Sequence, residues 1–189
     1  MVVNLTSFVQ NPFLTISSFD FLRFKQVVMK SQRLMDDLVD LEIESVDKII
    51  TKIESGDELE HIKSVELNLW KKIRAATLGG RRTGLGITGL GDTLAALNLK
   101  YGSSESIKIT EEIYKTLAVG AHTSSCVLAR ERGAFPVFDF KKEKDNAYLK
   151  KIMSACGPDV VEDRSQKYCA NYNCTHRVSF YNDANYFRH

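Results

Sequence analysis

The stretch RRTGLGITGLGD, residues 81–92, places Gly84, Gly86 and Gly89 at the spacing G-x-G-x-x-G. This spacing is the fingerprint of a dinucleotide-binding turn when a buried strand leads into it and a helix leaves it. Here the preceding residues have the pattern of a helix that ends at Gly79-Gly80, and no hydrophobic strand leads in. The stretch therefore fails the context test for a Rossmann fold.

We expect a structural purpose for this glycine loop instead. Glycine has no Cβ, so a glycine-rich backbone can pass close to another backbone or to a ligand without a side-chain clash. The residues that we assign to this structural loop are Arg82, Gly84, Gly86, Gly89, Gly91 and Asp92.

Length and composition indicate a folded protein of one domain. The chain has 189 residues and 43% hydrophobic content, enough for a real core. A formal net charge of +2 gives no electrostatic reason to expect nucleic acid or a membrane surface as partner. Neither a long apolar run nor a signal peptide is visible. We therefore expect a cytoplasmic protein whose four cysteines stay reduced.

Hydrophobic periodicity predicts a mainly helical chain. Long helices are expected at residues 21–50 behind a start at Ser17-Ser18, at residues 57–78, and at residues 104–132 with Gly133 as the stop.

Shorter elements are expected around these helices. A short helix should follow the glycine loop, with Asp92 or Thr93 near its N-cap and a closing turn at Tyr101-Gly102. Residues 134–140 predict a strand or an extended packing segment, and residues 141–155 predict a last amphipathic helix.

Two acidic residues in the first long helix are candidates for chemistry. Asp36 and Asp40 share a helix face, and a carboxylate metal site is conceivable there. No histidine has matching spacing, so we favour a solvated acidic face and expect no metal. In the next helix, we expect His61 to be a surface histidine and Trp70 to be a core residue.

The third long helix carries a cysteine and a histidine one turn apart, Cys126 and His122. Because both fall in the middle of an apolar helix, ordinary packing is favoured over a nucleophile and its base. The same helix is rich in small side chains, which predicts close packing against another element. These residues are Ala118, Gly120, Ala121, Ser124 and Ser125.

Several stretches together resemble the catalytic barrel of ribonucleotide reductases, most closely the adenosylcobalamin-dependent class. They are RRTGLGITGLGDTLAALNLKYGS, AVGAHTSSCVLARERGAFPVFD, NLTSFVQNPF and MDDLVDLEIE, in the order and spacing of that class, and they cover residues 4–151. The resemblance implies a ten-stranded α/β barrel. In the complete enzyme a thiyl radical on a loop cysteine starts replacement of the ribose 2′-hydroxyl by hydrogen, and a cysteine pair supplies the electrons.

The resemblance also implies what this chain lacks. The family's radical cysteine, in a motif N-x-C-x-E, lies upstream of the stretch that matches Asn4-Leu5. The family has C-N-L where this chain has Val3-Asn4-Leu5, so Val3 occupies the position of a reducing cysteine. We therefore expect a mainly α fragment of the barrel, with most strands missing and no catalytic residue of its own.

The tail allows two interpretations. Residues 154–189 contain no Leu, Ile or Met, and such a composition buries poorly. We therefore expect residues 1–153 to form the partial barrel domain and residues 154–189 to form an irregular tail. Cys169, Cys174, His176 and His189 could ligate zinc, although their spacing is not that of a usual finger. The favoured interpretation is a frameshift. From the second base of each codon, residues 167–189 permit a sequence containing A-P-T-G-S-V-S, as the resembled family continues.

The sequence thus predicts a piece of a ribonucleotide reductase that is inactive alone. Adenosylcobalamin and a nucleotide substrate are expected only in the complete enzyme, and the expected partners are the remaining parts of the reductase or further copies of the chain. Two alternatives stay open: one part of a split reductase, or a helical protein-binding module.

Overall fold

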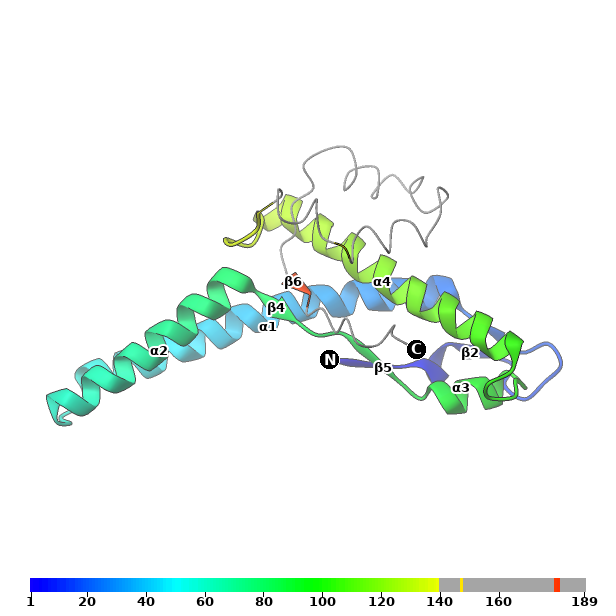
Figure 1. Ribbon diagram of the computed structural model, residues 1–189, viewed down its shortest axis with the longest axis horizontal. Coiled ribbons are helices and arrows are strands. Elements are labelled where there is room, and N and C mark those ends of the chain that lie inside the picture. Colours follow the sequence, from blue (N-terminus) through cyan, green and yellow to red (C-terminus); the bar gives the residue numbers. More distant parts are fainter. Residues whose placement is uncertain (140–146, 148–178, 181–189) are drawn as a thin grey trace.

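The structure is a computed structural model that describes residues 1–139, 147, 179 and 180. Helices dominate this part of the chain, as predicted (Figure 1). The helices are η1 (Leu5–Phe8), α1 (Phe21–Ser55), α2 (Glu60–Gly80), α3 (Leu90–Ala96) and α4 (Ser104–Arg132). The strands are β1 (Val2–Asn4), β2 (Val9–Gln10), β3 (Ser18–Phe19), β4 (Arg82–Thr83), β5 (Gly86–Thr88) and β6 (Ser179–Phe180).

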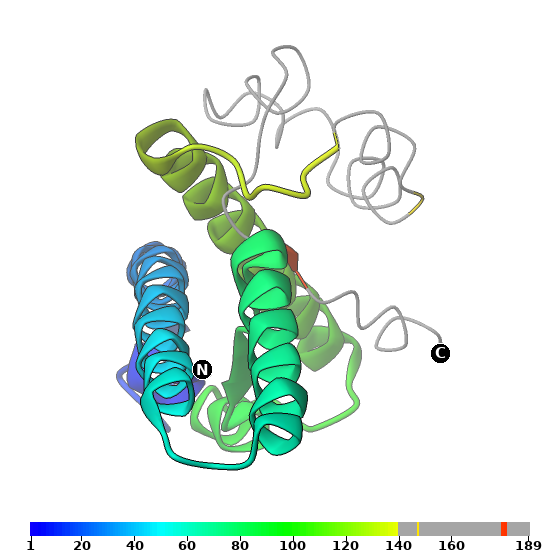
Figure 2. The same cartoon turned by 90° about the vertical axis from the view of Figure 1, so that its left-hand side faces the viewer.

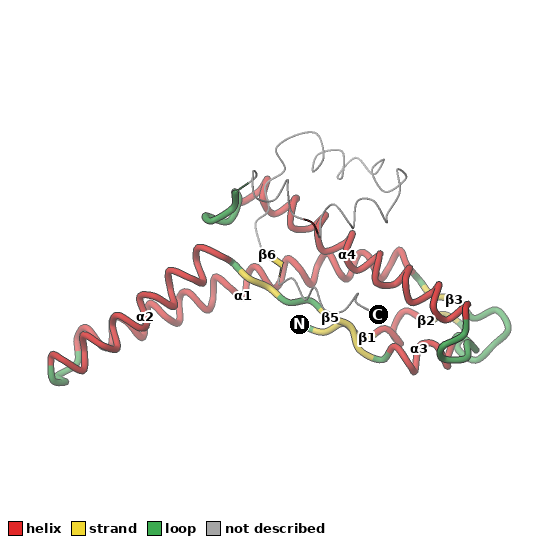
Figure 3. Tube along the Cα trace, viewed as in Figure 1, coloured by secondary structure: helices red, strands yellow, loops and turns green. Residues whose placement is uncertain are grey.

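The strands are short and pair two by two (Figure 3). β1 pairs in parallel with β5, β2 pairs antiparallel with β3, and β4 pairs in parallel with β6. Over the described residues these pairs form no closed barrel.

α1 organises the molecule. This 35-residue helix packs against α4 along its N-terminal half and against α2 along its C-terminal half, and α1 and α2 form a hairpin that projects from the rest (Figure 1). Seen from the end of the hairpin, α1 and α2 lie side by side (Figure 2). Ion pairs cross this hairpin, from Arg74 to Asp47 and from Lys71 to Glu54.

α1 begins at Phe21, as predicted, but its cap and its end differ from the prediction. The capping residue is Asp20, whose side chain accepts a hydrogen bond from the Arg23 amide at 2.9 Å, and not Ser17 or Ser18. Ser18 instead lies in β3, paired with β2. α1 also continues past Ile50 to Ser55, where Gly56 ends it.

The ends of α2 and α3 also differ from the prediction. Gly79 and Gly80 remain helical, and α2 ends at Gly80, before Arg81, which adopts the left-handed conformation with φ 42°. α3 is capped by Gly89 at φ 75°, and Asp92 and Thr93 fall inside the helix. α4, in contrast, has the predicted bounds, with a Ser103 cap and Gly133 after its end.

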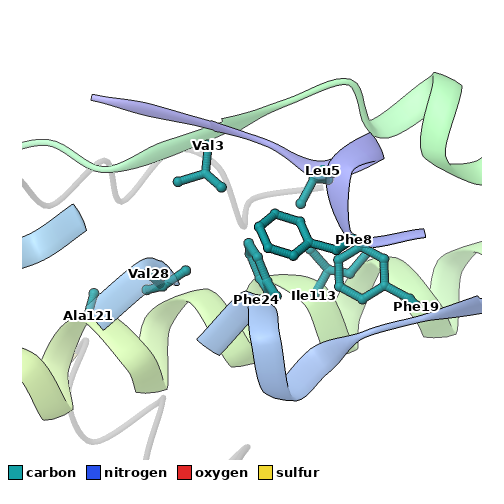
Figure 4. Packing of buried hydrophobic residues seen from close by; sticks show 8 residues of the cluster. All are labelled: Val3, Leu5, Phe8, Phe19, Phe24, Val28, Ile113 and Ala121. Carbon is teal, nitrogen blue, oxygen red and sulfur yellow. The ribbon is translucent and has the colours of Figure 1, made fainter. Parts of the chain in front are cut away.

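The core lies where α1 crosses α4 beneath the N-terminal segment (Figure 4). Its aromatic centre joins Phe8 to Phe24, with ring centroids 5.1 Å apart, and Phe19 to Phe24 at 5.5 Å. The buried members of the cluster are Val3, Leu5, Phe8, Phe19, Phe24, Val28, Ile113 and Ala121.

Two further expectations were wrong. Trp70 is only half-buried, because α2 packs on α1 along one face and fully buries none of its own side chains. After α4, the strand alternative is wrong, because residues 136–137 form a turn. The alternative of a packing segment agrees with Phe135, which is buried and contacts Phe138. The expected helix at residues 141–155 lies outside the described residues, apart from Ala147.

Candidate functional site: the glycine strand and its anchor

The glycine loop forms two short strands, β4 and β5, rather than a phosphate-binding turn, and we call residues 82–88 the glycine strand. β4 follows directly on Arg81, and β5 pairs in parallel with β1. In that pairing Val3 lies opposite Ile87, at the centre of the strand pair, and its expected equivalence to a reducing cysteine stays a prediction. Val3 is buried in the core cluster (Figure 4).

Of the loop glycines, Gly89 is the one whose close contact the structure explains. A Cβ at this position would lie 2.9 Å from Asn4 Oδ1 and 3.3 Å from Thr6 Cγ2, and the residue has a positive φ. Added Cβ atoms at Gly84, Gly86 and Gly91 would meet no described atom within 4 Å. Close approach to another part of the chain is therefore seen at Gly89, and for the other three glycines the expectation of close approach to a backbone or a ligand stays a prediction. Arg82 and Asp92 are exposed.

A buried carboxylate lies beside the start of β4. Asp36 is fully buried, and its Oδ1 accepts hydrogen bonds from Nε and Nη2 of Arg81 at 2.8 and 2.6 Å. Its Oδ2 accepts one from Arg132 Nη1 at 2.7 Å. The expected solvated acidic face is therefore wrong for Asp36, because two arginines compensate its charge inside the protein.

The neighbouring carboxylates complete this ion-pair cluster. Asp40 accepts from Arg81 Nη1 and Asp37 accepts from Arg132 Nη1, each at 2.6 Å, and both carboxylates are about half exposed. Burial lowers the pKa of Arg81, but its hydrogen bonds to Asp40 and Asp36 more than offset this, so the pKa lies above its ordinary value. The cluster thus keeps its arginines charged.

Arg81, Arg132 and Gln32 were not singled out from the sequence. Gln32 Nε2 donates to Thr83 Oγ1 at 3.0 Å, one helical turn before Asp36. A signal existed, because Gln32 and Asp36 fall on the same helical face as Val28 and Val39. Polar residues on an otherwise apolar face need buried partners.

The remaining candidates that the structure describes form no further site. Within the described part, no group of three or more metal-ligating side chains comes together, and this includes Asp36 and Asp40. Cys126 is buried in the packing of α4, and His122 is half-buried beside it. His61 is exposed, as expected. The proposed zinc ligands of the tail lie outside the described residues.

Comparison with known proteins shows the family. The family model described as "Ribonucleotide reductase, barrel domain" matches residues 2–175, and the chain therefore belongs to the ribonucleotide reductase barrel-domain family. The matched range includes both the strand pair β1–β5 and the cluster around Asp36, and it continues beyond residue 153.

The similar proteins are reductases. A vitamin B12-dependent ribonucleoside-diphosphate reductase of Mycobacterium tuberculosis (strain CDC 1551 / Oshkosh) is 36% identical over 80 residues, which are 42% of this chain and 12% of that protein. The protein of the same name from Thermoplasma acidophilum is 28% identical over 136 residues, 72% of this chain and 14% of that protein. The large subunit of the ribonucleoside-diphosphate reductase of African swine fever virus (isolate Tick/Malawi/Lil 20-1/1983) is 42% identical over 65 residues, 34% of this chain and 8% of that protein.

The chain spans between 8 and 14% of the length of these three proteins. No described helix is long and apolar enough to cross a membrane.

The described residues do not fit cobalamin-initiated chemistry by themselves. The thiyl radical that the resemblance implies needs a cysteine thiol that can approach both the cofactor and the substrate. Cys126 is the described thiol, and it is 2% exposed inside a packed helix. The described part therefore offers no cysteine in a position to receive a radical, and we derive no step through the cofactor.

Proposed function

We propose that this chain supplies the glycine strand and its supporting helices to a ribonucleotide reductase barrel, and that it has no reductase activity alone. The family match over residues 2–175 carries this proposal. The complete enzyme would reduce ribonucleotides to deoxyribonucleotides. Adenosylcobalamin is the cofactor we propose for it, since relatives are named vitamin B12-dependent.

The proposed inactivity rests on the residue at position 3. Replacing the 2′-hydroxyl by hydrogen takes two electrons, which a cysteine pair can give by forming a disulfide. Val3 has two methyl groups there, and an aliphatic side chain can neither give these electrons nor form that bond. None of the four cysteines lies in an N-x-C-x-E motif, so the chain also lacks the family's radical site.

Activity measurements test this proposal. Purified chain is incubated with adenosylcobalamin, a dithiol, an allosteric effector and ribonucleoside di- and triphosphates, and we expect no deoxynucleotide above a blank without protein. The catalytic barrel positions its groups to lower the barrier by several kcal/mol, which scattered parts do not do. Product formation by the isolated chain would refute the proposal.

A complementation experiment separates a split reductase from an inactive piece. The parts of the Mycobacterium tuberculosis relative that flank the matched region are added to this chain or to its Val3→Cys variant. We expect activity with Val3→Cys and none with the unaltered chain. Equal activity of both would show a split reductase that does not need a thiol at position 3.

The tail belongs to the same proposal. We propose that the reading frame changes within residues 154–189, although the family model still matches up to residue 175 in the frame as it stands. Reading the gene around codons 155–167 tests this directly. If the second-base frame does not encode an A-P-T-G run followed by more barrel sequence, the frameshift is excluded.

A protein-binding module is the second candidate, favoured by apolar side chains on the outside of α2. Ile62, Val65 and Leu69 are 41, 70 and 55% exposed and fall within two turns of the helix. Capture of partners from the chain's own cells discriminates between the candidates. A reductase component as partner supports the first proposal, and a specific unrelated target supports the second.

A further inference from the structure

The ion-pair cluster joins three segments that are far apart in the sequence. Asp36 lies in the middle of α1, Arg81 is 45 residues away where α2 turns into β4, and Arg132 is 96 residues away at the end of α4. Both oxygens of the Asp36 carboxylate are used, one by each arginine. Asp37 and Asp40 each bind one of these arginines and stay half exposed, so Asp36 is the shared buried acceptor.

A second contact lies beside this cluster. Arg81 and Thr83 are two residues apart where the left-handed turn at Arg81 leads into β4, and both side chains reach α1. Their partners Asp36 and Gln32 are four residues apart on α1, and therefore share one helix face. The start of the glycine strand is thus fastened to α1 at two points, while Arg82 between them is exposed.

The fastened segment leads within a few residues to the functional position. After Thr83, only Gly84 and Leu85 precede β5, in which Ile87 pairs with Val3. A strand that slips by one residue turns every side chain to its other face. The anchor on α1 can therefore decide which residue faces position 3.

We propose that Asp36 and Gln32 are positioning residues, which set the register of β5 against β1 by holding Arg81 and Thr83 on α1. The link to catalysis rests on the proposed function, because it takes position 3 as the place of a reducing cysteine. The geometric part does not depend on it. Asp36 contacts the glycine strand through Arg81 and contacts α4 through Arg132. We call these two contacts the strand arm and the α4 arm, and a substitution of one arginine removes one of them at a time.

Hydrogen exchange of the full chain tests the strand arm. Arg81→Lys keeps the charge but loses the paired contact to Asp36, and Thr83→Val keeps the shape but removes the acceptor of Gln32. In both variants we expect the amides of residues 86–88 to exchange about tenfold faster or more, with little change where α1 crosses α4.

The matched control removes the α4 arm, the contact between Arg132 and Asp36. Arg132→Lys should raise exchange in the last turn of α4 and leave residues 86–88 unchanged. A thiol reports on position 3 directly: in a Val3→Cys background, alkylation of that residue, followed by mass spectrometry, should accelerate with Arg81→Lys or Thr83→Val and not with Arg132→Lys. A purely structural cluster would not separate the two arms in this way.

The outcomes are distinct. Faster exchange confined to the strand pair in the first two variants supports the proposal. Unchanged exchange at residues 86–88 in both, or an equal rise over the whole chain in all three, overturns it. If Arg81→Lys does not fold, Thr83→Val decides. Since no substrate is used, this result is independent of whether complementation yields an active reductase.

Discussion

Gly89 combines two requirements in one residue. Its φ of 75° turns the chain from β5 into α3, and the missing side chain leaves room for Asn4, whose Oδ1 accepts from the amide and hydroxyl of Thr6. The turn after the glycine strand and the turn after β1 are therefore in contact. A change at Gly89 should disturb both.

Gly89→Ala is expected to lower the free energy of unfolding by about 1–2 kcal/mol for the left-handed backbone, and by more if Asn4 cannot move aside. Gly91→Ala is the matched control. Gly91 lies in the first turn of α3 with open space around it, so alanine should leave stability unchanged or raise it by up to about 1 kcal/mol. Denaturant melts of both variants measure the difference, and equal stability of the two would contradict this account.

Single residues also show which structural features can be predicted from a sequence pattern. Ser103 and Gly133 bound α4 through local hydrogen bonds, and these bounds were predictable because the signals lie next to the helix. The buried state of Asp36 depends on arginines 45 and 96 residues away, which no local pattern joins to it. The close contact at Gly89 likewise involves Asn4, a residue near the N-terminus that is distant in the sequence.

At the scale of elements, the crossing of α1 and α4 depends on a missing side chain. A Cβ on Gly120 would lie 2.9 Å from Val28 Cγ1, 3.3 Å from Val28 Cβ and 3.5 Å from the Lys25 carbonyl oxygen. Close by, Ser124 Oγ donates to the Met29 carbonyl oxygen at 2.8 Å. The small residues of α4 therefore bring the helix backbones together, as the sequence predicted.

Gly120→Ala should destabilise the chain by about 1–3 kcal/mol, since Val28 is β-branched and cannot easily rotate away. The better helix propensity of alanine offsets about 1 kcal/mol of this cost. Val28→Ala in the same chain should remove the clash, so the double variant should be more stable than the sum of the single effects predicts. Additive effects in denaturant melts would show that the contact is not limiting.

The α1–α2 hairpin should depend on pH through its ion pair. The hydrogen bond from Arg74 lowers the pKa of Asp47 below its ordinary value of 3.8, against the opposing effect of desolvation. A carboxyl with a lowered folded pKa stabilises the fold above its unfolded pKa, and this contribution disappears as the pH falls through the folded pKa.

Asp47→Asn should therefore cause a small loss of stability at neutral pH that vanishes below the folded pKa and shrinks at high salt. Thermal melts from pH 7 down to pH 2 measure this dependence. Glu58→Gln, at the exposed tip before α2, is the control and should change little at either pH. A loss that persists unchanged in acid would mean that packing, not charge, connects the helices.

The whole molecule leaves apolar side chains in contact with water. Besides the row on α2, Leu34, Leu38 and Leu41 of α1 are about half exposed. Where such side chains form a contiguous surface, they usually mark an interface. Exposed apolar faces were expected of a partial barrel, but Trp70 shows what periodicity leaves open: it indicates an apolar face on α2, not how much of that face the described chain covers.

We expect the isolated chain to self-associate at micromolar concentration and to bind an apolar dye. Val65→Lys together with Leu69→Lys should reduce both effects, and Asn68→Gln, an exposed polar position between them, should not. Analytical ultracentrifugation and dye fluorescence give the two readouts. A monodisperse monomer that binds no dye is incompatible with this expectation.

The parallel pairing of β1 with β5 has a consequence for the order of folding. The Met1 ammonium group donates to the Gly84 carbonyl oxygen at 2.9 Å across 83 residues of sequence, so this pair closes a long loop and loses the corresponding chain entropy before it gains contacts. The α1–α2 hairpin lies inside that loop and forms from contacts that are nearer in sequence. Hairpin formation should therefore come first and bring the two strands together. Substitutions in the hairpin should then slow folding, whereas substitutions at the strand pair should mainly accelerate unfolding, as stopped-flow kinetics can measure.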